Sequence, residues 1–431
     1  MKLVVLGLGV TGDAVVRDAH SRGDHVTVIE DDPGGPGYEQ RLERAAASGA
    51  TVVEQSAPDA LTDLIAGADL FVPSPGASPR HPAVAAARAA GVTIRSEVDL
   101  AAERIGDQVL VAVTGTNGKT TVTSLVADMV TASGVDALAA GNIGRPLLDA
   151  VGGPAEVVVA EVSSFQLAFT TAAFRPRVAV LLNLAEDHLD WHGSFTEYVA
   201  AKAKIFANQL DDDALVFNAD DERVARLAAT APGRRIPFTV ADVATGERRE
   251  QANARAAAAA ATEVGATATG IAAALRDFTG LPHRMQLVGE RDRVRYYDDS
   301  KATNPHATLA GVGEAPGPVV LIAGGRNKGI DLSVLRPLAP DLRAVVAIGE
   351  AAGEVAGVFA GLTPVVEASD MGAAVARAAE HAQPGDVVIL SPACASFDWY
   401  ESYGARGDDF AREVARLLAR DPGRLGEQVN G

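Results

Sequence analysis

A buried strand, a glycine-rich loop and an amphipathic helix follow one another between Val109 and Gly134, and this succession limits the possible folds more than any other feature of the chain. The run VLVAV is apolar and β-branched, which is typical of a strand covered on both faces. A strand that leads directly into a helix predicts a parallel α/β sheet. The apolar residues of the helix recur at intervals of three and four positions before Gly134 ends it: Val122, Leu125, Val126, Met129 and Val130.

The loop between this strand and helix carries groups that bind a polyphosphate. Gly115 and Gly118 allow backbone N–H groups to turn toward an anion. Lys119 supplies a cation, and Thr120 supplies a hydroxyl group for Mg²⁺. The spacing departs from the common G-x-x-x-x-G-K-[ST] pattern, since Val113 stands where the first glycine is expected. A glycine-rich turn with a surface lysine is the alternative, but Gly-Lys-Thr-Thr at the start of a helix favours a nucleotide loop.

Length and charge narrow the class of protein. A chain of 431 residues exceeds one ordinary hydrophobic core and predicts about three domains. The net charge of −18 argues against a nucleic-acid partner, because phosphate backbones are bound by clustered lysine and arginine. An anionic substrate must therefore be held by a few local cations in glycine-rich loops.

The sequence predicts neither secretion nor membrane insertion. The amino-terminal run MKLVVLGLG is interrupted by glycine too early for a signal peptide, and we expect no apolar stretch of about 18 residues that would span a membrane. The single cysteine, Cys394, excludes internal disulfides and cysteine-based metal clusters. We expect a cytoplasmic protein in which Cys394 is a small buried residue.

Short β-rich runs alternate with helical patterns along the chain. Five such runs lie within residues 1–100, a second group begins at Val109, and a third group of five begins after Leu281. The stretch from about 231 to 250 is polar and is expected to be irregular, and an alanine-rich helix follows it. Three α/β domains with parallel sheets are the simplest account of this alternation.

The amino terminus contains a G-x-G-x-x-G motif directly after a predicted strand. Gly7, Gly9 and Gly12 form the motif, and Glu30 ends the next strand. Such a motif lets a phosphate group approach the amino end of a helix, but it does not choose between a nicotinamide dinucleotide and another nucleotide. We favour a nucleotide other than NAD, with NAD and a purely structural turn as the alternatives.

Polar residues stand at the ends of strands in the second group. Ligands of open parallel sheets gather beyond the carboxyl ends of the strands. The run VVVAE ends in Glu161, whose carboxylate is suited to hold Mg²⁺ opposite the phosphate loop. His188 in LAEDHLDWHG is a candidate metal ligand or acid–base group, although a lone histidine is more often a solvated loop residue.

Three polar loops follow predicted strands in the third group. In YYDDSKATNPHAT, Asn304 and Pro305 are expected to begin a helix, which leaves Asp299 and Lys301 without a structural explanation. Three such loops at strand ends predict an anion-binding rim. The other two loops contribute Lys328, Ser396 and Tyr403.

With these residues assembled, the chain resembles the Mur ligases of peptidoglycan synthesis. In that family TGTNGKTT is the usual form of the ATP loop, so the late Gly115 is characteristic. The segment LSPACASFD resembles the branch of the family that adds D-glutamate. The segments that carry the resemblance span nearly the whole chain in the family's order: TGTNGKTT, EVSSFQL, NLAEDHLD, YVAAKAKIF, LPHRMQLV, DDSKATNPHAT, GGRNKGID and LSPACASFDWYESYGARGDDF.

The resemblance implies an α/β fold with three domains. These are a Rossmann-like UDP-binding domain at residues 1–103, a central P-loop ATPase domain at 104–280 and a Rossmann-like amino-acid-binding domain at 281–431. The implied activity is that of an ATP-dependent carbon–nitrogen ligase, which adds D-glutamate to UDP-N-acetylmuramoyl-L-alanine through an acyl phosphate. ATP and two Mg²⁺ ions would be required, and a monomer is expected.

The resemblance also implies four groups of site residues. The UDP substrate would contact Val10, Thr11, Ser74, Gly76 and Asn142. ATP would contact Gly115, Thr116, Asn117, Gly118, Lys119, Thr120, Thr121, Asn253, Arg284 and Asp299. The metal ligands would be Thr120, Glu161, His188 and Lys202, with Lys202 as a carbamate formed with CO₂, and the catalytic residues would be Lys119, His188 and Lys202. D-glutamate would face Lys301, Thr303, Lys328, Ser396 and Tyr403.

Some positions depart from the family pattern. Asp31 and Asp32 stand where a hydroxyl residue and a basic residue are expected near the uridine, Ala185 replaces a common hydroxyl residue, and Tyr403 replaces a frequent phenylalanine. These departures concern the contacts to UDP rather than the chemistry. A folylpolyglutamate-type ligase and a nicotinamide-dependent dehydrogenase are the alternatives. A degenerate regulatory homologue is disfavoured because every expected charged residue is present.

Overall fold

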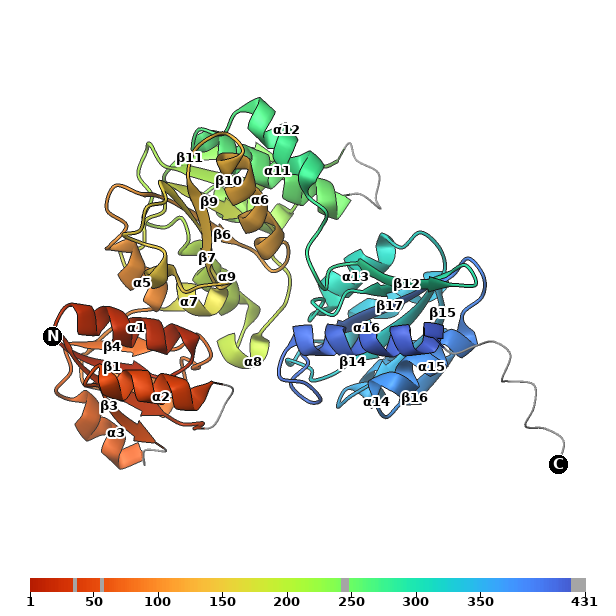
Figure 1. Ribbon diagram of the computed structural model, residues 1–431, viewed down its shortest axis with the longest axis horizontal. Helices are drawn as coiled ribbons and strands as arrows, with labels where there is room; N and C mark the ends of the chain where they lie inside the picture. The colour runs from red at the N-terminus through yellow and green to blue at the C-terminus, as the bar shows by residue number, and fades with distance from the viewer. Residues whose placement is uncertain (34–36, 55–57, 242–247, 420–431) are drawn as a thin grey trace. The chain divides into compact units, whose positions relative to one another are not determined.

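The computed structural model describes residues 1–33, 37–54, 58–241 and 248–419. These residues form two compact units. The first includes Met1–Leu184, Trp191–Asp242 and Glu250–Phe278, and the second includes Ala185–Asp190 and the described chain from Thr279 onward. In Figure 1 the first unit runs from red to green and most of the second is teal and blue.

The first sheet has five parallel strands in the order β3-β2-β1-β4-β5. Because the strand order reverses at β1, the carboxyl ends of β1 and β4 form the crevice where such sheets bind ligands. The strands are β1 (Lys2–Leu6), β2 (His25–Glu30), β3 (Thr51–Glu54), β4 (Leu70–Pro73) and β5 (Thr93–Ile94). The helices are α1 (Val10–Ser21), α2 (Tyr38–Ala47), α3 (Pro58–Ile65), α4 (Pro82–Ala89) and α5 (Glu97–Ala102).

The second sheet has six parallel strands in the order β11-β10-β9-β6-β8-β7. Because β6 lies between β8 and β9, the loops that follow these three strands meet at one edge. The strands are β6 (Val109–Thr114), β7 (Ala137–Gly141), β8 (Val157–Glu161), β9 (Val178–Leu181), β10 (Ala214–Asn218) and β11 (Arg234–Phe238). The helices are α6 (Lys119–Thr131), η1 (Leu147–Asp149), α7 (Ser164–Ala168), α8 (Leu189–His192), α9 (Phe195–Ala203), α10 (Glu222–Ala228), α11 (Arg248–Glu263) and α12 (Ala268–Asp277).

The third sheet forms the core of the second unit, in the order β12-β13-β17-β14-β15-β16, and only the β12–β13 pair is antiparallel. Because β13, β17 and β14 are neighbours, the three polar loops predicted to form a rim do follow adjacent strands. The strands are β12 (Gln286–Arg291), β13 (Val294–Asp298), β14 (Val319–Gly324), β15 (Leu342–Ile348), β16 (Val365–Ala368) and β17 (Val387–Ala393). The helices are α13 (Pro305–Gly313), η3 (Leu332–Asp341), α14 (Ala352–Phe359), α15 (Met371–His381) and α16 (Tyr403–Ala419).

The central strands are apolar because helices cover both faces of the sheets. Leu110 and Ala112 of β6 face one hydrophobic cluster, whereas Val111 and Val113 face another. The third sheet is covered by α13, η3 and α14 on one face and by α15 and α16 on the other (Figure 1). One cluster extends without a break from Leu3 in the first sheet to the second sheet, so these two sheets share a core.

Three strands lie where the sequence did not predict them. For the described residues, the expectation of an irregular stretch from about 231 to 250 was wrong, because β11 runs through it and α11 begins within it. Residues 242–247 of that stretch lie outside the described part of the chain. The strands β7 and β12 were not predicted either. All three are edge strands with partly exposed side chains, so they lack the apolar run that marks a central strand.

The alanine-rich helix α11 forms as predicted and packs against the second sheet. Ala256, Ala257, Ala260 and Ala261 are fully buried, since their small side chains allow close approach. Within the part of the chain that the structure describes, none of the helices is both long and apolar enough to cross a membrane.

Candidate active site

The predicted phosphate loop lies between β6 and α6, as the sequence indicates. Gly118 precedes the first turn of α6 with a φ of 85°, a conformation that glycine adopts without strain. A Cβ atom at this position would lie 2.4 Å from Asn253 Oδ1. The missing side chain therefore lets Asn253 of α11 reach the loop, which brings together two of the residues predicted to contact ATP.

Asn183 braces this loop from the end of the neighbouring strand β9. Its Oδ1 accepts a hydrogen bond from Asn117 N at 2.8 Å, and its Nδ2 donates to Asn117 O at 3.1 Å. Its backbone carbonyl accepts from Thr116 N at 3.0 Å. The sequence assigned Asn183 no role, although its place at a strand end beside β6 was a usable signal.

Two lysine side chains converge on one carbonyl group of the loop. Lys119 Nζ donates to Gly115 O at 3.0 Å, and Lys202 Nζ donates to the same oxygen at 2.8 Å. Lys202 is fully buried, with its Nζ also 3.4 Å from Thr114 Oγ1. Two ammonium groups that share an acceptor repel each other. The site therefore favours an anion beside them or the loss of charge from one of them.

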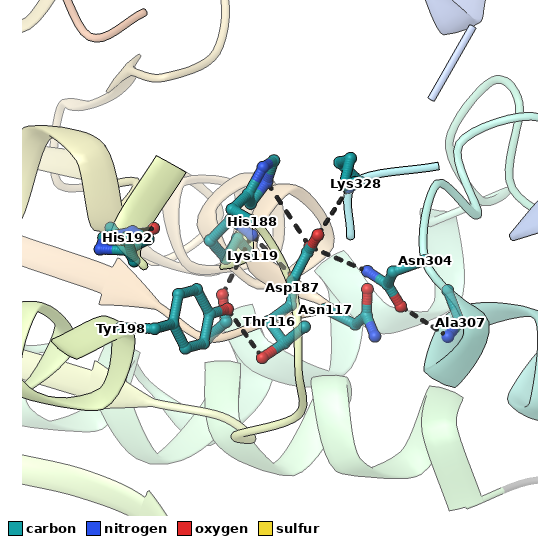
Figure 2. Close-up of polar contacts among 12 residues, drawn as sticks. Thr116, Asn117, Lys119, Asp187, His188, His192, Tyr198, Asn304, Ala307 and Lys328 are labelled. Atoms are coloured by element: carbon teal, nitrogen blue, oxygen red, sulfur yellow. Dashed lines mark hydrogen bonds and ion pairs between the residues drawn. The ribbon is translucent and has the colours of Figure 1, made fainter. Parts of the chain in front are cut away.

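Tyr198 and His192 are parts of this site that the sequence analysis missed. Tyr198 precedes Lys202 by one helical turn, so both side chains lie on the same face of α9. Its hydroxyl lies 2.9 Å from Thr116 Oγ1 (Figure 2), and its ring centroid lies 4.7 Å from Lys202 Nζ. His192 is buried, bonds Ser164 Oγ at 2.9 Å and meets the Tyr198 ring edge-on.

Glu161 ends β8 beside β6 and is 3% exposed. Its Oε1 accepts a hydrogen bond from Asn142 Nδ2 at 2.8 Å. Its Oε2 is buried and has no hydrogen-bond partner among the described residues. Because a buried carboxylate oxygen needs a compensating donor or cation, this atom fits the predicted Mg²⁺ ligand.

The described part of the chain contains no group of three His, Cys, Asp or Glu side chains that could hold a metal by themselves. Mg²⁺ usually binds one or two carboxylates and completes its coordination with water and substrate phosphate oxygens. Glu161 and the half-buried Thr120 in the first turn of α6 suit that mode of binding.

Four of the five predicted UDP contacts lie at the carboxyl ends of β1 and β4. Ser74 Oγ donates to Gly7 O at 3.1 Å, and a Cβ on Gly7 would lie 2.8 Å from that hydroxyl oxygen. Gly76 follows two residues later, and Val10 and Thr11 form the first turn of α1. Val10 is 60% exposed.

Glu30, the acidic residue that follows the glycine motif, is hydrogen-bonded within the protein. Glu30 Oε2 accepts a hydrogen bond from Leu8 N at 2.6 Å, and its Oε1 accepts from Asp32 N at 3.0 Å. In dinucleotide-binding folds the equivalent carboxylate is turned toward the ribose hydroxyl groups. Since Glu30 is buried against the loop instead, the geometry disfavours NAD. Asp31 pairs with His81, at 2.8 Å between Oδ2 and Nε2.

In the second unit, Asp299 is buried at the end of β13. Its Oδ2 accepts a hydrogen bond from Ser391 Oγ at 2.9 Å, and its Oδ1 accepts from Met285 N at 3.3 Å. A Cβ on Gly311 would lie 2.5 Å from Asp299 Oδ2, so α13 packs directly against the carboxylate. Arg284, predicted with Asp299 to contact ATP, immediately precedes Met285.

Three residues predicted to face D-glutamate lie close together in this unit. Lys301 Nζ is 5.2 Å from the ring centroid of Tyr403, and Thr303 N donates to Lys301 O at 2.9 Å. The Tyr403 ring also meets His283 edge-on, with 6.1 Å between the ring centroids. His283 Nδ1 in turn lies 2.7 Å from the buried Asp298 Oδ2.

Arg406 holds two of the rim loops from inside and was also missed by the sequence analysis. Its guanidinium group donates to the carbonyls of Ser300, Cys394 and Ala395 at 2.9, 3.1 and 3.2 Å. Burial lowers the pKa of Arg406 to about 10 and raises that of the Cys394 thiol to about 12. Cys394 is buried, as expected. Ser396, two residues after Cys394, is 2% exposed.

The segment Ala185–Asp190 belongs to the second unit, and Asp187 is its buried carboxylate. Figure 2 shows that side chain between Lys328 and Asn304, whose Nζ and Nδ2 atoms lie 2.6 and 3.1 Å from its oxygens. His188 Nε2 lies 3.5 Å from Asp187 Oδ2, and His188 has a φ of 55°, which is uncommon for a residue other than glycine. The sequence analysis assigned no role to Asp187. Asn304 caps α13 as predicted.

The structure thus gathers the predicted residues within each unit. Lys119, Glu161 and Lys202 stand at the carboxyl edge of β6, β8 and α9 in the first unit, and His188 belongs to the second unit. A metal ion shared by His188 and Lys202 stays a prediction, as do the individual substrate contacts.

Three family models match the chain in order. They are "Mur ligase MurD-like, N-terminal domain" at residues 1–96, "Mur ligase middle domain" at 113–290 and "Mur ligase, glutamate ligase domain" at 283–394.

Curated relatives match over nearly the whole length. The chain is 40% identical to the UDP-N-acetylmuramoylalanine--D-glutamate ligase of Desulfosudis oleivorans, over 98% of each protein. It is also 40% identical to the ligase of the same name from Frankia casuarinae, over 96% of this chain and 94% of that one.

Solved structures share the fold. MurF from Acinetobacter baumannii matches with a TM-score of 0.62 and 15% identity over 95% of this chain and 93% of that one. The MurF ligase from Thermotoga maritima in complex with ADP matches with a TM-score of 0.60 and 16% identity over 91% of this chain and 96% of that one. At these identities the likeness concerns the fold alone.

Proposed function

Since the chain belongs to the Mur ligase family, we propose that it is the ATP-dependent ligase that joins D-glutamate to UDP-N-acetylmuramoyl-L-alanine in peptidoglycan precursor synthesis. Relatives that carry this activity in their names are 37 to 40% identical to it over nearly their full length. The structural observation that carries the proposal is the convergence of Lys119 and Lys202 on Gly115 O, at the same edge as Glu161.

The proposed reaction activates a carboxylate. The terminal carboxylate of UDP-N-acetylmuramoyl-L-alanine attacks the γ-phosphorus of ATP, the bond to the bridging oxygen breaks, and ADP leaves with an acyl phosphate formed. Charge concentrates on the transferred phosphoryl group during this step, and Lys119 at the start of α6 is placed to offset it. Gly118 contributes a backbone N–H group of a loop that Asn183 already holds in shape.

Mg²⁺, when bound, neutralises phosphate charge and orients the phosphoryl group. Thr120 and Glu161 would hold one ion, and we keep His188 and a carbamylated Lys202 as the proposed ligands of a second. A carbamate gives Lys202 an anionic oxygen in place of an ammonium group, which also removes its repulsion with Lys119.

The amine of D-glutamate then attacks the acyl carbon, the carbon–oxygen bond to phosphate breaks, and phosphate leaves. In the second unit Lys301, Lys328 and Ser396 follow the neighbouring strands β13, β14 and β17, which supports the predicted rim for an anionic amino acid. We propose that this rim, with Thr303 and Tyr403, binds D-glutamate. His188 and Asp299 are the candidate bases for the amine proton.

Substrate-dependent release of ADP and phosphate tests the proposal. The purified protein is incubated with ATP, Mg²⁺ and UDP-N-acetylmuramoyl-L-alanine, together with D-glutamate, L-glutamate or meso-diaminopimelate. ADP and phosphate should form in equal amounts with D-glutamate, and only background release is expected with the other two amino acids. Release that is the same with all three, or that needs no UDP substrate, contradicts the proposal.

The two alternative activities are tested in parallel. A folylpolyglutamate-type ligase would release ADP with a folate and L-glutamate, and a dehydrogenase would change the absorbance of NADH without ATP. The inward-facing carboxylate of Glu30 argues against the dehydrogenase. We place the protein in the cytoplasm, which is where ATP is available and where a single buried cysteine is usual.

A further inference from the structure

A carboxylate and an ammonium group form a buried ion pair inside the predicted amino-acid rim. Asp187 Oδ1 lies 2.6 Å from Lys328 Nζ, and the two side chains are 6% and 9% exposed (Figure 2). Lys328 was predicted to face D-glutamate as part of an anion-binding rim. In this structure the same cation already holds a carboxylate of the protein.

The position of Asp187 is tied to the beginning of α13. Asn304 Nδ2 donates to Asp187 Oδ2 at 3.1 Å, and Asn304 Oδ1 accepts from Ala307 N at 2.9 Å. One side-chain amide therefore caps the helix and orients the carboxylate. Since Asn304 is itself 3% exposed, the arrangement is shielded from water. Asp187 is thus fixed beside the segment that carries Lys301 and Thr303.

The charges of the ligand decide whether this ion pair helps or hinders binding. A buried charge that loses its partner is strongly disfavoured. A dicarboxylate that bound Lys328 would leave Asp187 without its cation. An amino acid also carries an ammonium group. Asp187 can therefore exchange the lysine for the ammonium group of the ligand, while Lys328 exchanges the aspartate for a carboxylate of the ligand.

We propose that Asp187 binds the ammonium group of the incoming amino acid while Lys328 binds one of its carboxylates. The inference rests on the proposed function and adds a residue that determines specificity. Asp187 selects amino acids against dicarboxylic acids of the same length, and its role is to bind the amine before the chemical step.

The Asp187→Asn variant tests this with two ligands that differ only in the amine. D-glutamate is the substrate, and glutarate, which lacks the amine, is the competitive inhibitor. We expect the KM for D-glutamate to rise at least about tenfold, because its ammonium group loses an anionic partner. We expect the inhibition constant of glutarate to fall by about tenfold, because Lys328 is no longer paired with a carboxylate.

The opposite directions of the two expected changes, in the KM for D-glutamate and in the inhibition constant of glutarate, distinguish this role from structural damage. Asp187 also lies beside His188, and damage to that residue would weaken both ligands or neither. Glu186→Gln is the matched control, since it makes the same change in charge at the exposed neighbouring position. It should leave both constants within about twofold of the unmodified protein.

Each possible result decides the question. Constants that move in the same direction in Asp187→Asn, or that both stay unchanged, overturn the role of Asp187. If turnover by the variant is too low to measure, thermal shifts with D-glutamate and glutarate give the same comparison, and Asp187→Ser replaces a variant that fails to fold. If the unmodified protein shows no D-glutamate-dependent release of ADP, the proposed function fails instead.

Discussion

The two lysines at Gly115 present an electrostatic conflict at the scale of single residues. Two like charges that are held close together inside a protein repel each other. Lys119 and Lys202 nevertheless donate to one carbonyl oxygen, and Lys202 is buried against the ring of Tyr198. A bound polyphosphate would remove the conflict at Lys119, and the proposed carbamate would remove it at Lys202.

Replacement of Lys119 tests the first half of this account. In Lys119→Ala the transferred phosphoryl group would lose the cation that we assign to it, so ADP formation dependent on both substrates should fall by about 100-fold or more. Lys2→Ala, at an exposed position, is the control and should keep full activity. Normal turnover by Lys119→Ala would show that the phosphate-loop assignment is wrong.

Replacement of Lys202 tests whether this residue carries a carbamate. With ¹³C-labelled bicarbonate, the unmodified protein should show a carbamate ¹³C resonance that Lys202→Ala lacks. The variant should lose activity and recover part of it when a short carboxylic acid is added, because the acid restores an anionic oxygen in the vacated space. Absence of the resonance from the unmodified protein contradicts the carbamate whatever the activity.

At the scale of elements, α5 joins the first sheet to the second through two buried carboxylates. Glu97 Oε1 accepts a hydrogen bond from Leu148 N at 2.7 Å, and Asp99 Oδ1 accepts from Thr171 N at 2.8 Å. These two hydrogen bonds join α5 to two different connections between strands of the second sheet, so α5 fixes the two connections relative to each other. Burial is the main cause that raises the pKa of Glu97 from 4.5 to about 7.

This raised pKa predicts how stability depends on pH. The native state binds the Glu97 proton more tightly than the unfolded chain, so the contribution is complete below pH 4.5 and is lost as the pH rises to about 7. Glu97→Gln cannot ionise. The free energy of unfolding of Glu97→Gln minus that of the unmodified protein should therefore increase between pH 4.5 and 8, by up to about 3 kcal/mol.

Urea unfolding of both proteins across this pH range measures the effect. Glu39→Gln on the exposed side of α2 is the control, and its difference from the unmodified protein should not change with pH. If the difference for Glu97→Gln also stays constant, then Glu97 is ionised in the native state throughout the range and the explanation is wrong.

At the scale of the whole molecule, the net charge of −18 opposes the compact state. Added salt screens repulsion between exposed charges, with a Debye length of about 10 Å at 0.1 M. The free energy of unfolding should therefore rise by about 1 kcal/mol between roughly 10 and 200 mM NaCl. EDTA is included so that divalent ions do not contribute, and KCl must give the same result. A fall in stability with either salt would indicate that attractive ion pairs outweigh the overall repulsion.

Much of the fold was predictable because central strands and amphipathic helices carry local apolar patterns. The β6–α6 unit and the five strands from β13 to β17 that were predicted all form, since burial on both faces requires continuous apolar runs. The edge strand β11 was missed because exposure on one side removes that pattern. The glycine loops were recognisable because their conformations need specific residues at specific positions.

The sequence alone determined the central strands, the amphipathic helices, the family and the residue types at the strand ends of this protein. These features depend on neighbours along the chain. Only the tertiary structure decided that Glu30 faces inward, that Tyr198 joins Thr116 to Lys202, and that Asp187 pairs with Lys328. The physical reason is that the partner of a buried polar group comes from a distant part of the chain. Folding excludes water from both groups at once, and local sequence does not encode which groups then meet.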